Sequence, residues 1–148
     1  MIQRKQSLFL LAVLLIGITM VFLPFQTISI NNQIMALCLM PSCCSDIMDS
    51  TIYYPMVLNF SSILLSIFTV FQFKNRVLQY KLSNVIALIN AFITGLFFLL
   101  VFTKIGAIEN VHFTFGAFLP IISVFCAFFA AHFIKKDEQL VRNSDRIR

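Results

Sequence analysis

Four long stretches of apolar residues divide the chain, and shorter polar segments separate them. An apolar helix of about 20 residues, rising 1.5 Å per residue, spans the ~30 Å hydrocarbon core of a bilayer. The pattern therefore predicts an all-α membrane protein, a single domain in which four transmembrane helices form an up-down bundle. The predicted helices cover residues 7–24, 55–73, 82–103 and 113–134.

The segments between these helices differ in character. Residues 25–54 form the longest loop, which is predicted to be extracytoplasmic, and its weak alternation from Thr27 to Asn31 would suit a short strand. Residues 74–81 form a basic connector, and residues 135–148 form a charged tail. Pro120 removes a backbone donor within the fourth apolar stretch, so we expect the fourth helix to be kinked or wedged there.

The N-terminal stretch also has an alternative interpretation. A basic lead followed by an apolar run is typical of a cleavable signal peptide. The run is longer than the usual 7–15 residues, and the bulky residues of 22–25 follow it instead of a small-residue cleavage site. These features favour a retained first helix.

Composition supports the membrane assignment. Hydrophobic residues make up 59% of the chain and charged residues only 11%, against about 45–50% and 25% in soluble domains. The net charge of +5 comes from basic residues at helix ends and in the tail. Because they do not gather on one face with interleaved aromatics, the charge does not indicate a nucleic-acid partner.

The distribution of positive charge predicts the orientation. All but one of the 11 Lys and Arg residues lie in the N-terminal lead, the connector or the tail. By the positive-inside rule, both termini face the cytoplasm of a multi-pass protein in the cell inner membrane, where basic side chains meet anionic lipid headgroups. The residues named as topology determinants are Arg4, Lys5, Lys74, Arg76, Lys81, Lys135 and Lys136.

Three segments on this predicted cytoplasmic side carry a resemblance. They read MIQRKQ at residues 1–6, FKNRVLQ at 73–79, and KDEQLVR at 136–142 followed by DRIR. Together they resemble a bacterial family of four-helix integral membrane proteins classed as a domain of unknown function. Asn143-Ser144 departs from the Ser-Ala expected there. The resemblance implies the fold and the membrane location, but no site, cofactor or activity.

Cysteines are the first candidates for chemistry. Cys38, Cys43 and Cys44 lie in the extracytoplasmic loop, where Cys38 could form a structural disulfide with either of the other two. All three could also stay reduced. A quinone-linked disulfide oxidase needs a second dithiol, and the second loop contains none. The spacing to His112 matches no standard zinc pattern, and Cys126 is expected to behave as a small apolar residue.

Small and polar residues also recur at helical spacing within the predicted membrane spans. The predicted helices contain no Asp, Glu, Lys or Arg, the usual mark of an ion path, so close helix packing is the favoured interpretation. A polar path through a small transporter is the alternative. The stripes comprise Asn59, Ser62 and Ser66; Ala87, Asn90 or Ala91, Thr94 and Gly95; and Gly116, Pro120, Ser123, Ala127 and Ala130.

These observations predict a non-enzymatic accessory or scaffold protein without a cofactor. Its expected partners are the lipid bilayer and a membrane or cytoplasmic protein or a second copy. The tail could be the docking element, because a helical continuation would place Leu140 and Ile147 on one side. The alternatives are a thiol–disulfide redox protein that uses the loop cysteines, and a small transporter subunit.

Overall fold

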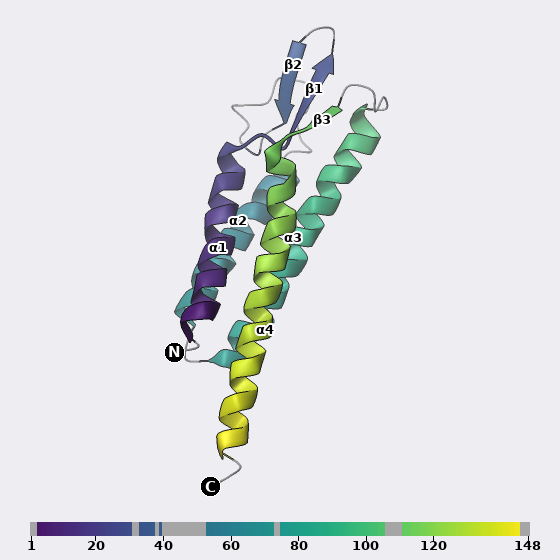
Figure 1. Cartoon of the computed structure of the whole chain (residues 1–148). Helices are drawn as coiled ribbons and strands as arrows, with labels where there is room; N and C mark the ends of the chain where they lie inside the picture. The colour runs from purple at the N-terminus through teal and green to yellow at the C-terminus, as the bar shows by residue number, and fades with distance from the viewer. Residues whose placement is uncertain are drawn as a thin grey trace.

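The computed structural model describes residues 3–30, 33–37, 39, 53–72, 75–105 and 111–145. Neighbouring helices run side by side in opposite directions, and α4 closes the bundle by packing against both α3 and α1 (Figure 1). The predicted up-down bundle of four helices is confirmed. The helices are α1 (Gln3–Phe22), α2 (Tyr53–Phe71), α3 (Arg76–Ile105) and α4 (Leu119–Asp145).

A small antiparallel sheet lies at the end of the bundle where α1 ends and α2 begins (Figure 1). Its strands are β1 (Gln26–Ile30), β2 (Gln33–Leu37) and β3 (Val111–Phe113), in the order β2-β1-β3. Gln26 is opposite Leu37 on one side and Phe113 on the other. The weak alternation indicated only β1, so the sheet is an addition to the predicted helical fold.

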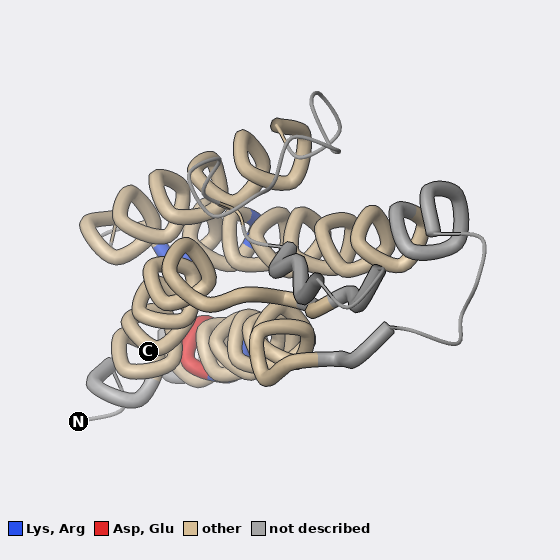
Figure 2. Tube along the Cα trace, turned by 90° about the horizontal axis from the view of Figure 1, so that it is seen from above, with Lys and Arg blue, Asp and Glu red and all other residues tan. Residues whose placement is uncertain are grey.

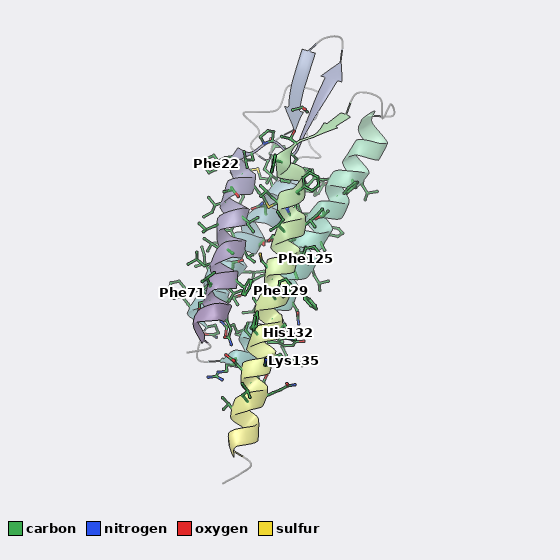
Figure 3. All side chains as sticks on the ribbon, in the orientation of Figure 1. Phe22, Phe71, Phe125, Phe129, His132 and Lys135 are labelled. Carbon is green, nitrogen blue, oxygen red and sulfur yellow. The ribbon has the colours of Figure 1, made fainter. Side chains whose placement is uncertain are left out.

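Apolar side chains cover the outside of the bundle. Phe71 and Leu88 are 73% and 70% exposed, Phe22 and Phe71 lie at the edge of the bundle (Figure 3), and most of the described trace carries no charge (Figure 2). Within the described residues, α2, α3 and the segment Phe115–Val141 are long and apolar enough to cross a membrane. The apolar stretch Gln6–Phe22 of α1 is shorter.

Two apolar clusters fill parts of the interior. One contains Val13, Ile86 and Ala127, which come from three different helices. The other lies nearer the sheet, where the rings of Phe25 and Phe97 stack with their centroids 3.9 Å apart. These clusters hold α1, α3 and α4 together.

The helix α3 begins earlier than the sequence pattern indicates. The predicted connector 74–81 is helical from Arg76 onward. Asn75 caps this helix, because its Oδ1 accepts a hydrogen bond from the Leu78 backbone N–H at 3.3 Å. Since no glycine or proline follows within the connector, nothing delays the helix until residue 82.

The fourth helix also has different limits. A 3-10 turn, η3 (Phe115–Phe118), follows β3, and α4 begins only at Leu119. The kink expected at Pro120 is therefore wrong: this proline lies in the first turn, where its missing N–H is not needed. At the other end, α4 continues to Asp145, so most of the predicted tail is helix.

Candidate functional site

The inward face of α2 is polar. Its buried residues are Pro55, Asn59, Ser62, Ser66 and Thr69, while its large apolar side chains face outward. This arrangement reverses that of a soluble helix and suits a protein surrounded by lipid. The predicted shared face of Asn59, Ser62 and Ser66 is confirmed.

Hydrogen bonds join this face to α3. The Asn90 Nδ2 donates to Ser62 Oγ at 2.9 Å, and the Gln79 Nε2 donates to the Thr69 carbonyl at 3.4 Å. The Ser66 hydroxyl donates instead within its own helix, to the Ser62 carbonyl at 2.8 Å. The polar side chains therefore pair with the protein itself and hold α2 against α3.

The small-residue stripes of the other helices differ in outcome. On η3 and α4 all five predicted residues are buried, from Gly116 to Ala130. On α3, Asn90 is buried, but Ala91 and Gly95 are exposed. A Cβ atom added at Gly95 would meet nothing within 4 Å. The packing interpretation thus holds for α4 and fails for the outer part of the α3 stripe.

Two buried polar atoms, one on α2 and one on α4, lack hydrogen-bond partners. Asn59 Oδ1 and Ser123 Oγ are buried without a hydrogen bond. Ser123 lies one helical turn before Ala127 and so shares the face of α4 that packs in the Val13 cluster. Asn59 Oδ1 faces α1, since a Cβ atom added at Gly17 would lie 3.9 Å from it.

Three helices meet through polar groups at the end of the bundle opposite the sheet. Gln6 of α1 donates its amide to Asp137 Oδ2 of α4, and also to the Phe133 carbonyl at 3.4 Å. Arg76 of α3 donates from Nη1 to the Asp137 carbonyl at 3.4 Å. Asp137 is only 5% exposed, and its Oδ1 has no partner. We call Gln6, Arg76 and Asp137 the terminal clamp.

The terminal clamp is the feature that the sequence did not indicate. Asp137 belongs to the predicted solvated tail, yet α4 continues and places it on the buried face three residues after Ile134. The sequence feature that could have indicated the longer helix is the absence of any glycine or proline after Pro120. Because such a segment can remain helical, the buried face extends through Asp137.

The predicted topology determinants gather at the same end of the bundle as the terminal clamp. Arg4 and Lys5 lie in the first turns of α1, Arg76 and Lys81 at the start of α3, and the pair 135–136 on the lower part of α4 (Figures 1 and 3). Lys74 lies outside the described residues. The common location agrees with the charge pattern, while the membrane side it faces stays a prediction.

The structure tests few of the predictions made for the cysteines. Cys38, Cys43 and Cys44 lie outside the described residues, so their pairing stays open. Cys126 has a free thiol, is half-buried and packs against the Val13 cluster. His112 lies in β3 opposite Thr27. In the part of the chain that the structure describes, no three His, Cys, Asp or Glu side chains are grouped to hold a metal.

Comparison with known protein families matches residues 2–147 to the domain of unknown function DUF4293. The chain belongs to the DUF4293 family. The match covers nearly the whole chain and confirms the predicted membership of a family of unknown function. No curated protein and no solved structure matches significantly. For this DUF4293 protein, any role must therefore be argued from its own residues.

Proposed function

We propose that this DUF4293 protein is a non-enzymatic accessory or scaffold subunit of the inner membrane, and that the end of α4 holds its partner. In this proposal the bundle end that carries the terminal clamp faces the cytoplasm. A membrane-embedded scaffold needs a rigid bundle and a recognition element outside the bilayer, and the described residues provide both.

The projecting end of α4 is the observation that carries the proposal. Its 27 residues give a helix of about 40 Å, longer than the ~30 Å hydrocarbon layer. Figure 1 shows α4 continuing beyond the ends of the other helices. On its inward face Ile134 is 0% and Asp137 5% exposed, whereas Val141, one turn further, is 47% exposed. The face that packs on the bundle thus continues without cover.

The chemistry of this face indicates the kind of partner. Val141 is an exposed apolar side chain, and charged residues surround it along the helix, including Lys136 and Glu138. An amphipathic helix of a cytoplasmic protein, with an apolar stripe and polar edges, would cover such a face. The terminal clamp supports this role because it ties the base of the projecting segment to α1 and α3.

The interior supports a role based on contacts. The Ser66 hydroxyl bonds within α2, the Asn90 amide bonds to Ser62, and the Gln79 amide bonds to the Thr69 carbonyl. The bonds of Asn90 and Gln79 hold α3 against α2. A rigid bundle would present the α4 end in a constant orientation, which is what a docking platform requires.

Site-specific photo-crosslinking in cells tests the proposal. A photoreactive residue at Val141 should give a discrete protein adduct, whereas one at Gln139, on the outward side of the same turn, should not. Val141→Asp should reduce recovery of the adducted protein when the crosslinker is placed at Glu138, which lies about 60° from Val141 around the helix. Equal labelling from both positions, or adducts with lipid alone, would overturn the proposal. An adduct between two copies would replace the cytoplasmic partner with self-association.

The orientation needs its own test. Alkaline phosphatase fused after residue 145 should be inactive, because this enzyme requires export to fold, and a fusion after residue 30 should be active. The reverse result would place the α4 end outside the cytoplasm. It would contradict the proposed partner class even if a crosslink formed.

A further inference from the structure

A basic and aromatic cluster lies along the seam between α3 and α4. The Lys135 Nζ lies 6.0 Å from the centroid of the Tyr80 ring, within the range of a cation–π contact. Arg76 precedes Tyr80 by one helical turn and so shares its face of α3. Its guanidinium reaches the Asp137 carbonyl on α4. We call Arg76, Tyr80 and Lys135 the seam cluster.

The seam cluster lies further from the sheet than most of the large apolar side chains that cover the outside of α3 and α4. Toward the sheet, beyond the exposed His132, the same two helices expose large apolar side chains such as Leu88 and Phe128, which are 70% and 61% exposed. Lys135 is exposed and lies further from the sheet along α4 than Phe125 and Phe129, as Figure 3 shows. Basic and amphipathic aromatic side chains favour the boundary of a lipid-facing apolar surface, where headgroups begin.

The local electrostatics favour an anion. The helix α3 begins at Arg76, so the positive end of its dipole lies at the cluster. Arg76 uses one of its five donors on the Asp137 carbonyl. The Asp137 carboxylate is buried and accepts from Gln6 of α1. Positive charge from two helices therefore converges at one place on the surface.

We infer that the seam cluster binds the phosphate of an anionic phospholipid. Arg76 and Lys135 contribute charge-assisted hydrogen bonds, and the Tyr80 hydroxyl contributes a further donor. The acyl chains lie along the exposed apolar surface of α3 and α4. The site lies beside the base of the projecting α4 segment, but its occupancy does not depend on the proposed protein partner.

Lipid binding to the purified full-length protein in a neutral detergent tests the inference. Native mass spectrometry should show that phosphatidylglycerol binds at lower concentration than phosphatidylcholine. Lys135→Gln should weaken phosphatidylglycerol binding about fivefold, the effect expected for one basic residue near an anionic surface. Lys135 is exposed, so this variant should keep its far-ultraviolet circular dichroism spectrum.

Lys81→Gln provides the matched control. Lys81 follows Tyr80 but is exposed about 100° further around α3, away from the seam. The Lys81→Gln substitution removes one positive charge at the same end of the bundle, and it should change phosphatidylglycerol binding less than twofold. Equal losses in both variants would indicate diffuse attraction and overturn the site. Equal binding of the two lipids, or full displacement by millimolar inorganic phosphate, would also overturn the assignment to lipid.

Discussion

Gly116 is the position where one methyl group should disturb this fold most. It lies in η3, directly against the chain that leaves α1. A Cβ atom there would be 2.2 Å from the Pro24 carbonyl oxygen, 2.8 Å from its carbonyl carbon and 3.1 Å from Phe25 Cα. All three are backbone atoms, so no side-chain rotation can relieve the contact. Gly116→Ala must push η3 away from the α1–β1 link.

The cost follows from the nature of this contact. Inserting a methyl group into a packed interior costs about 1–3 kcal/mol, and rigid backbone on the opposing side places Gly116→Ala near the upper value. For a domain of this size 1 kcal/mol corresponds to about 2–4 °C in melting temperature. We therefore expect a decrease of about 6–12 °C. The disturbance should reach Phe25, whose ring stacks on Phe97.

Two other glycines provide graded controls. At Gly17 a Cβ atom would be 2.9 Å from Ile63 Cγ1, which belongs to a flexible side chain, so Gly17→Ala should cost about 1 kcal/mol. At Gly95 nothing lies within 4 Å, and Gly95→Ala should be neutral or raise stability through helix propensity, by at most about 1 kcal/mol.

Thermal unfolding of the detergent-solubilised variants, followed by circular dichroism, measures this series. The protein has no Trp, so tryptophan fluorescence cannot report on unfolding. Gly95→Ala should have the highest melting temperature of the three variants, Gly17→Ala an intermediate one and Gly116→Ala the lowest. A Gly116→Ala variant that melts within about 2 °C of the wild type would refute the reasoning, because the close approach to Pro24 would then be absent.

Three further outcomes follow from the polar groups inside the bundle, each measured by thermal unfolding. Asn90→Ala and Ser62→Ala should be coupled by about 0.6–2 kcal/mol in a double-mutant cycle, and additive losses would contradict their bond across helices. Asn59→Leu should raise stability by about 1 kcal/mol, because removing the unpartnered Oδ1 outweighs losing the weak bond from Asn59 Nδ2 to Met20 Sδ at 3.7 Å, and a lower melting temperature would contradict this balance. Gln6→Leu should cost about 1–3 kcal/mol, and adding Asp137→Leu should restore most of it; no recovery would contradict the pairing in the terminal clamp.

The existence, the number and the alternating up-down order of the helices could be predicted from the sequence. Apolar runs of bilayer length are a local property, and so is the polar face of α2, where Asn59, Ser62 and Ser66 recur at helical spacing. The residues at which the helices begin and end were harder to predict, because they depend on individual capping and pairing contacts. Asn75 caps α3, and α4 begins at Leu119 only after β3, which pairs with β1, and the 3-10 turn η3.

Local features of the sequence are enough to specify a four-helix membrane protein with most of its basic residues at one end, since length, apolarity and charge act on each segment separately. Which helix faces meet depends on the packing of the whole bundle. That packing turned Asp137 inward against Gln6 and left Gly95 facing outward. It also brought Arg76, Tyr80 and Lys135 together from two helices. Such contacts join residues far apart in the chain, so no local pattern specifies them.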